Sequence, residues 1–216
     1  MVVAVPVKDL VNAKQRLARA LGPAERAALA RAMLEDVLTA LAAARLDAVW
    51  VVTRDDEAAA LARGFGAEVL AEAENRGHTS AVAFAQAHAL ARGARCFATI
   101  PGDVPCVTAA EIRALADATG AADRVCVFTP SRSGLGTNGA ALVPPDAMPL
   151  TFGEPSFDNH LAAARARGLT PRVLPLPGLG LDVDAPEDLA ALLDAGGHTA
   201  SGRLVAGWKL APAARA

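Results

Sequence analysis

The stretch "ATIPGDVPCV" (residues 98–107) joins a short apolar run to a loop that carries a single acid, Asp103. Pro101 and Gly102 end the apolar run, and Pro105 restricts the backbone on the far side of the carboxylate. Taken alone, an aspartate in a loop of this kind is most simply explained as a turn residue. The order of strands and helices around it decides whether it does more.

Apolar runs typical of buried strands alternate along the chain with segments of helical spacing. Strands are predicted over residues 2–7, 48–53, 67–72, 95–101, 124–130, 139–144 and 172–176. Helices are predicted over residues 22–46, 55–66, 79–93, 108–119, 154–168 and 185–196. This alternation predicts an α/β fold, with a mostly parallel sheet covered by helices on both faces. We expect one domain over residues 1–196 and a loosely attached tail over residues 197–216. Ligands of such sheets bind at the carboxyl ends of the strands, where Asp103 lies.

Composition narrows the class of protein. The 216 residues include 21 basic and 23 acidic side chains, so no strong field favours nucleic acid or a membrane as a partner. Cys96, Cys106 and Cys126 lack metal-ligand spacing, and the strand-like context of the first and last favours buried thiols. The N-terminal residues lack the pattern of a signal peptide, and no apolar run approaches membrane-spanning length. We therefore expect a soluble, cytoplasmic protein. The sequence leaves open whether it forms a homodimer.

A second acidic cluster lies in "GLDVDAPEDL" (180–189). Asp182 and Asp184 alternate along an extended segment and therefore point in opposite directions. Asp184, on the strand side of a helix start, is the better placed to reach a ligand, although both acids could simply serve that helix start. One carboxylate from each of two strand ends, Asp103 and Asp184, suits Mg²⁺, which also takes water and phosphate oxygens as ligands.

Three basic side chains follow the first predicted strand, in the connection where sheets of this type bind nucleotide phosphates. They are Lys8, Lys14 and Arg16. The chain has neither a P-loop nor a glycine-rich dinucleotide fingerprint. Charged side chains can replace backbone amides as phosphate ligands, so we expect these three to bind phosphate. A solvated basic loop is the alternative.

A glycine-rich turn and a helix start form another candidate anion site. In "GLGTNGAALVPP" (134–145), Thr137 and Asn138 are expected to be exposed at the tip of the turn. Gly153 and Ser156 lie where the next predicted helix begins. Small hydroxyl side chains and free amides at a helix start can bind an anion. The alternative is a hairpin tip followed by an ordinary helix cap.

In order and spacing, five motifs resemble those of the 2-phospho-L-lactate and phosphoenolpyruvate guanylyltransferases of coenzyme F-420 biosynthesis. They are "VPVKDLVNAKQRLA", "IPGDVPCV", "GTNGAALVPP", "FGEPSFDNHLAAARARG" and "LDVDAPEDL". The resemblance extends to about Leu193. It implies a single-domain, Rossmann-like nucleotidyltransferase fold of the nucleotide-diphospho-sugar transferase type.

The resemblance also implies a reaction. GMP passes from GTP to the phosphate of a phosphorylated three-carbon acid (phosphoenolpyruvate, 2-phospho-L-lactate or 3-phosphoglycerate), and pyrophosphate is released. It places the two aspartates that bind Mg²⁺ at Asp103 and Asp184, with Asp182 as the second choice. Asp103, Asp184 and Lys14 are expected to form the catalytic group.

The resemblance further assigns the residues that bind the two substrates. Lys8, Lys14 and Arg16 are expected to hold the triphosphate. Thr79, in "GHTSA" (77–81), stands where the family usually has asparagine, so it is an expected nucleotide contact at which this chain departs from the pattern.

The acceptor phosphate is expected to bind Thr137, Gly153 and Ser156. A phosphate monoester is largely dianionic at neutral pH, with a second pKa of about 6, so it can attack without a protein base. The protein then needs only to position the acceptor and neutralise charge. Two alternatives remain: a nucleotidyltransferase with a sugar phosphate or the molybdopterin cofactor as acceptor, and a non-catalytic nucleotide-binding domain.

Overall fold

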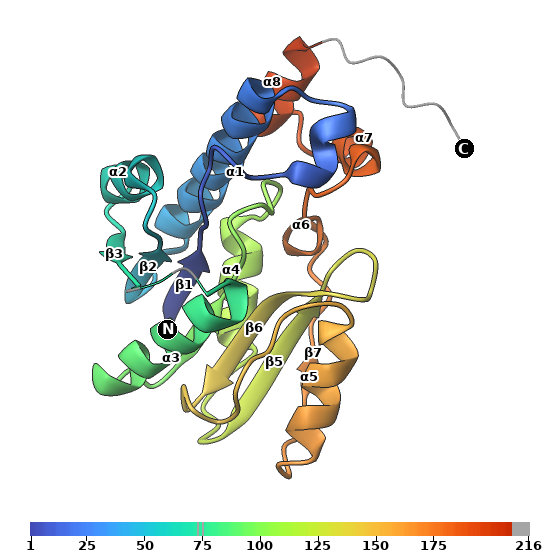
Figure 1. Ribbon diagram of the computed structural model, residues 1–216. Helices are drawn as coiled ribbons and strands as arrows, with labels where there is room; N and C mark the ends of the chain where they lie inside the picture. The colour runs from blue at the N-terminus through green and yellow to red at the C-terminus, as the bar shows by residue number, and fades with distance from the viewer. Residues whose placement is uncertain (73, 75, 209–216) are drawn as a thin grey trace.

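The computed structural model describes residues 1–72, 74 and 76–208, and a seven-stranded sheet runs through this part of the chain (Figure 1). The strands are β1 (Val2–Pro6), β2 (Ala48–Val52), β3 (Glu68–Leu70), β4 (Phe97–Thr99), β5 (Val125–Pro130), β6 (Thr137–Val143) and β7 (Arg172–Val173). Their order in the sheet is β3-β2-β1-β4-β6-β5-β7. Strand β6 pairs antiparallel with β4 and β5, and the other pairs are parallel. The predicted mostly parallel sheet is confirmed.

Helices cover both faces of this sheet, as predicted. The helices of the described residues are a short 3₁₀ helix, η1 (Gln15–Arg19), and α1 (Pro23–Ala44), α2 (Asp56–Gly64), α3 (His78–Ala91), α4 (Ala109–Asp117), α5 (Ser156–Arg165), α6 (Pro177–Gly180), α7 (Pro186–Ala195) and α8 (Ala200–Gly207). Side chains of a strand alternate between faces. Val3 and Val5 of β1 therefore pack in a cluster with α1, α2 and α4. Val2 and Ala4 pack on the opposite face, in a cluster with α3 and α5.

A third apolar cluster lies beside the sheet and joins η1, α1, α7 and α8. Leu17, Met33, Val183, Leu192 and Val205 are fully or almost fully buried in it. Burial of each such side chain stabilises the fold by about 1.5–3 kcal/mol. The cluster therefore holds the connection after β1 close to the segment that leads into α7.

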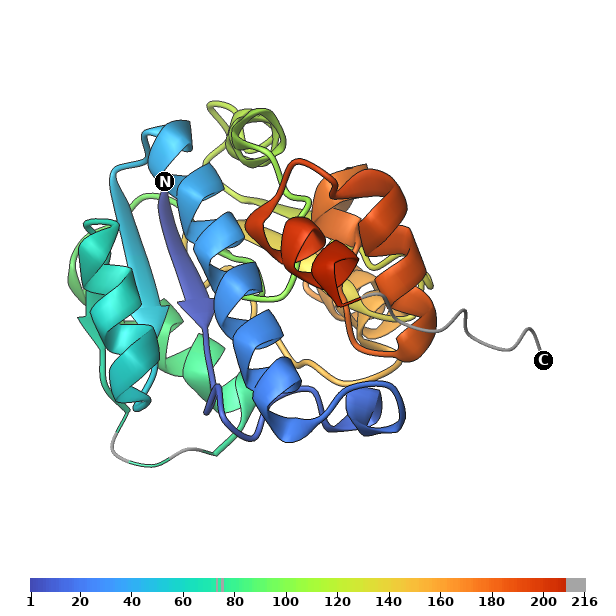
Figure 2. The same ribbon diagram turned by 90° about the horizontal axis from the view of Figure 1, so that it is seen from above.

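The prediction of a loosely attached tail was wrong for its first part, because helix α8 packs against α1 (Figure 2). The amides of Ala200 and Ser201 donate to the Asp36 carboxylate at 2.7 and 2.9 Å, and Thr199 caps the helix by accepting from the amide of Gly202. An acid and a hydroxyl cap at a helix N-terminus satisfy amides that lack an intrahelical partner. The expectation for residues 209–216 lies outside the described residues.

The three cysteines are free and buried, which confirms the prediction for Cys96 and Cys126. Burial raises the pKa of the Cys106 thiol, and the nearby acids Asp36 and Glu111 raise it further, to about 11. The thiols are therefore protonated at neutral pH and pack as small apolar groups. Every helix in the described part of the chain is too short or too polar to cross a membrane.

Candidate active site

The loop after β4 carries Asp103 to the carboxyl ends of β1 and β4. The main-chain amide of Val183 donates to the carbonyl oxygen of Asp103 at 3.1 Å. This hydrogen bond fastens residues 181–184 to the loop and places Asp184 beside Asp103. The segment is not a strand of the sheet. The expectation that Asp184 follows a strand end was therefore wrong, although the two acids do come together.

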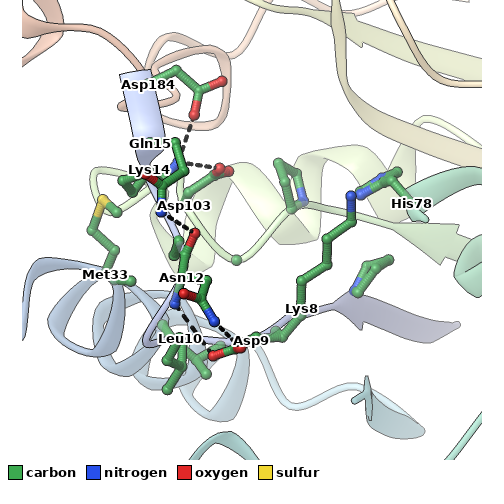
Figure 3. A pocket seen from close by; sticks show the side chains of 17 residues that line it. Lys8, Asp9, Leu10, Asn12, Lys14, Gln15, Met33, His78, Asp103 and Asp184 are labelled. Atoms are coloured by element: carbon green, nitrogen blue, oxygen red, sulfur yellow. Dashed lines mark hydrogen bonds and ion pairs between the residues drawn. The ribbon is translucent and has the colours of Figure 1, made fainter. Parts of the chain in front are cut away.

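Lys14 lies between the two carboxylates (Figure 3). Its Nζ is 2.5 Å from Oδ2 of Asp103 and 2.6 Å from Oδ1 of Asp184, and its side chain is 7% exposed. Burial opposes the charge of Lys14, but the carboxylates of Asp103 and Asp184 outweigh it, so the pKa of Lys14 is raised. The ammonium group is therefore charged at neutral pH and neutralises much of the repulsion between the two acids.

Asp182 points away from this pair, as the alternation of side chains predicts. Its Oδ1 accepts a hydrogen bond of 3.0 Å from Nδ2 of Asn138, which also donates to the carbonyl of Gly180 at 3.1 Å. Burial raises the pKa of Asp182, and the carboxylates of Asp103 and Asp184 add to the increase against the hydrogen bond from Asn138. Asp182 therefore ties the segment to β6, whereas Asp184 faces Lys14.

Asp188, in the first turn of α7, holds the main chain of Asp184. Its Oδ2 accepts from the amides of Asp184 and Ala185 at 3.0 and 2.8 Å, and its Oδ1 is 2.5 Å from Nη2 of Arg132. The amide of Arg132 in turn donates to the carbonyl of Gly180 at 2.7 Å. The turn between β5 and β6 therefore fixes both ends of the segment that presents Asp184.

A cavity of about 550 Å³ opens beside the acid pair. Lys8 and His78 lie across it from Lys14 (Figure 3). Burial lowers the pKa of His78, which leaves its ring neutral at neutral pH. The cavity therefore has two acids and a buried lysine on one side and an exposed lysine with a neutral imidazole on the other.

Thr137, Ser156 and His160 form a buried hydrogen-bonded group. The amide of Thr137 donates to Oγ of Ser156 at 3.0 Å, and Oγ1 of Thr137 is 3.0 Å from Nδ1 of His160. The expectation that Thr137 and Asn138 are exposed was wrong: both belong to β6, which begins at Thr137, and each is 7% exposed. Among the residues described, this group does not line the cavity beside Asp103. It is linked to the acid segment through the Asn138–Asp182 hydrogen bond.

The ring of His160 sets the direction of these hydrogen bonds. Its Nε2 accepts from the amide of Thr151 at 3.0 Å. Burial lowers the pKa of His160 to about 4, so the ring is neutral at neutral pH and its proton is on Nδ1. Nδ1 therefore donates to Oγ1 of Thr137, and the hydroxyl hydrogen of Thr137 is left to donate to another acceptor.

Gly153 precedes α5 and has a φ of 125°. A residue with a side chain would be strained in this backbone conformation. A Cβ built there has no atom within 4 Å, so space does not exclude a side chain. Gly153 is thus required for its backbone conformation.

Two expected nucleotide contacts lie away from the cavity. The turn of η1 directs Arg16 outward, where its side chain is exposed. Oγ1 of Thr79 accepts from the amide of Phe152 at 2.9 Å and approaches the carbonyl of the same residue at 3.4 Å. Neither residue is part of the cavity wall in the described structure. Their predicted contacts with the nucleotide stay predictions.

Sequence reasoning missed His78 as a residue of the cavity wall. His78 directly follows Gly77, whose φ of 95° turns the chain into α3, so a glycine before a helix start was the available signal. No local pattern distinguishes His160 from an ordinary packing histidine. Its partners come from residues nine and twenty-three positions away.

The sheet with one antiparallel strand has the fold of solved nucleotidyltransferases, and acids and lysines gather at its carboxyl edge. A solved structure from Desulfovibrio desulfuricans, named as a nucleotide-diphospho-sugar transferase, has the same fold, with a TM-score of 0.77 at 18% identity. The similarity covers 95% of this chain and 94% of that one.

Within this class the chain belongs to the family described as guanylyl transferase CofC like, whose model matches residues 1–206. It is 41% identical over 189 residues to a phosphoenolpyruvate guanylyltransferase of Conexibacter woesei, covering 87% of this chain and 85% of that one. It is 36% identical over 189 residues to a 2-phospho-L-lactate guanylyltransferase of Methanothermobacter thermautotrophicus, covering 88% and 82%. The resemblance found in the sequence motifs is confirmed.

Proposed function

We propose that this protein transfers GMP from GTP to the phosphate of a phosphorylated three-carbon acid and releases pyrophosphate, as a step of coenzyme F-420 biosynthesis. Phosphoenolpyruvate and 2-phospho-L-lactate are the first candidates for the acid, since the two relatives above carry these names; 3-phosphoglycerate is the third. The observation that carries the proposal is the convergence of Asp103 and Asp184 on the ammonium group of Lys14.

The donor set of this convergence fits a divalent cation, and we propose Mg²⁺. One oxygen of Asp103 and one of Asp184 already share a cationic neighbour, Nζ of Lys14. Mg²⁺ in proteins is commonly held by one or two carboxylates together with water and substrate phosphates. Asp103 and Asp184 would hold the ion, with Asp182 as the second choice; once bound, it would neutralise charge on the reacting phosphates.

The lysines and the acid pair act on the nucleotide. Lys8 and Lys14 face the same cavity and bind the triphosphate as point charges. The acceptor phosphate attacks the α-phosphorus, the new P–O bond forms, and the bond to the β-phosphate oxygen breaks with its electron pair leaving on pyrophosphate. The attacking oxygen is already deprotonated, so no side chain removes a proton. Positioning and charge neutralisation are the protein's contribution.

Thr137, Gly153 and Ser156 are proposed to hold the acceptor phosphate. His160 donates to Oγ1 of Thr137, so the Thr137 hydroxyl can direct its own hydrogen to a phosphate oxygen. The positive φ of Gly153 leaves its backbone unshielded by a side chain. A hydrogen bond to a charged group contributes about 1.5–3 kcal/mol, so each such contact would favour a phosphorylated acceptor over an unphosphorylated one.

Pyrophosphate release with a panel of acceptors tests the proposal. The protein is incubated with GTP, Mg²⁺ and, in separate reactions, phosphoenolpyruvate, 2-phospho-L-lactate, 3-phosphoglycerate and glucose 1-phosphate. Release that depends on one of the three acids supports the assignment. Release with the sugar phosphate alone, or no release with any acceptor, contradicts it.

A further inference from the structure

A second cavity, of about 390 Å³, adjoins the first at the carboxyl ends of β1 and β2. Lys8 and His78 line both cavities. A nucleotide whose triphosphate lies between Lys8 and Lys14 can therefore extend its base into the second cavity. This step rests on the proposed function, in which GTP is the GMP donor.

Three carboxylates line the second cavity: Asp9, Asp55 and Glu72. Asp9 accepts from two main-chain amides of its own loop and, through its second oxygen, from the side chain of Asn12. Asp55 caps α2 with one oxygen and accepts from the amide of Leu10 with the other. The oxygens of these two acids are therefore engaged in holding loops.

Glu72 differs from the other two acids. Its side chain is half-buried, and its carboxylate has no hydrogen-bond or ion-pair partner among the described residues. It follows β3 by two positions, and the carbonyl of Leu70 at the end of that strand accepts from the amide of Thr53 at 3.1 Å. The chain is thus anchored to β2 directly before it presents Glu72 to the cavity.

A carboxylate and guanine have complementary hydrogen-bonding edges. A carboxylate accepts hydrogen bonds at both oxygens, and guanine presents two adjacent donors, N1–H and the 2-amino group. Adenine presents an acceptor at N1, which would face a carboxylate oxygen unfavourably. We propose that the second cavity binds the guanine base and that Glu72 selects guanine by accepting from N1–H and the 2-amino group.

The test compares wild type with Glu72→Gln in binding to GTP, ITP and ATP by calorimetry, without an acceptor. ITP keeps N1–H but lacks the 2-amino group. Loss of one hydrogen bond to a charged group predicts that wild type binds GTP about ten- to a hundredfold more tightly than ITP. A glutamine side chain has one acceptor oxygen, so Glu72→Gln should bring the two affinities within about threefold.

Glu74→Gln is the matched control, because Glu74 is exposed, pairs with Arg76 at 2.8 Å and does not line the cavity. It should keep the wild-type preference, and both variants should keep the wild-type melting temperature. A Glu72→Gln variant that keeps the full preference for GTP over ITP and ATP overturns the assignment of Glu72 and leaves the proposed function standing. A wild type that binds GTP and ATP equally overturns both.

Discussion

Lys14 combines three features that separate it from an ordinary surface lysine. It is almost completely buried, it contacts two carboxylates, and its backbone has a left-handed φ of 55°. A non-glycine residue in this region costs of order 1–3 kcal/mol, which the surrounding contacts must offset. The sequence predicted Lys14 as a phosphate ligand, and the family resemblance grouped it with the two acids. Its burial and its direct contact with both carboxylates could not be predicted, because Asp184 is 170 positions away.

Replacing Lys14 by methionine should abolish most turnover and weaken GTP binding, since the acid pair and the triphosphate lose their shared cation.

The raised pKa of Lys14 also determines how the stability of the fold depends on pH. A raised folded-state pKa stabilises the fold below the ordinary value of 10.5, and this contribution is lost as pH rises through the folded-state pKa. The excess stability of wild type over Lys14→Met should thus be constant near neutral pH and decline above about 10.5. Urea titrations at several pH values from neutral upward measure it; an excess stability that does not decline above about 10.5 would contradict the pairing.

His160 should destabilise the fold on acidification. Burial lowers its folded-state pKa from 6.5 to about 4, so the unfolded chain binds the proton more tightly. The contribution of His160 is therefore complete above pH 6.5 and is lost as pH falls towards about 4. His160→Asn should remove this part of the acid sensitivity. Equal pH profiles for wild type and variant would mean that the ring is already charged in the folded protein.

Thr137→Val should raise the KM for the acceptor acid and leave that for GTP nearly unchanged. The expected change is about tenfold to a hundredfold, the value of a hydrogen bond to a charged group. Steady-state kinetics with each substrate varied in turn measure both constants, and the KM for GTP is the internal control. Equal weakening of both substrates would point to general damage of β6 rather than to an acceptor site.

At the scale of elements, long periodic segments were predictable and short ones were not. Helix α1 has leucines and other apolar residues at helical spacing, and its predicted range of 22–46 differs from Pro23–Ala44 by two residues at most. The helices η1 and α6 have five and four residues, too few for a periodic pattern. Helix α8 was missed because its glycines and alanines suggested a tail, whereas its N-terminus is stabilised by Asp36 from α1, 164 positions away.

The segment that leads into α7 shows how an element positions a site residue. Asp188→Ala removes the acceptor for the amide of Asp184, so the Asp184 carboxylate should become less well placed. Loss of a helix cap costs about 0.5–2 kcal/mol, which should lower the melting temperature modestly. Turnover should fall by more than the small loss of stability explains, and the Mg²⁺ concentration needed for half-maximal activity should rise. Asp194→Ala, an exposed acid of the same helix, is the control. An unchanged Mg²⁺ requirement in Asp188→Ala would mean that Asp188 stabilises the helix but does not position Asp184.

At the scale of the whole molecule, the site depends on chain segments that meet only in the folded protein. Lys14 comes from the connection after β1, Asp103 from the loop after β4, and Asp184 from the segment before α7. The third apolar cluster holds the first and last of these together. The sequence predicted that Asp103 and Asp184 meet, but for a reason that is only half right: Asp103 follows strand β4, whereas Asp184 follows no strand and is held there by the hydrogen bond from Val183 to Asp103. It could not predict Glu72, since a lone acid after a short strand carries no pattern.

Transfer of labelled GMP tests the central claim most directly. Wild type, Asp103→Asn and Asp184→Asn are incubated with GTP labelled at the α-phosphorus, Mg²⁺ and phosphoenolpyruvate or 2-phospho-L-lactate. The label should enter a diphosphate-linked guanosine adduct of the acid with wild type, and each variant should lose this transfer by orders of magnitude while retaining its fold, because the charge at the acid pair is reduced. Full transfer by both variants would contradict the assignment of the active site.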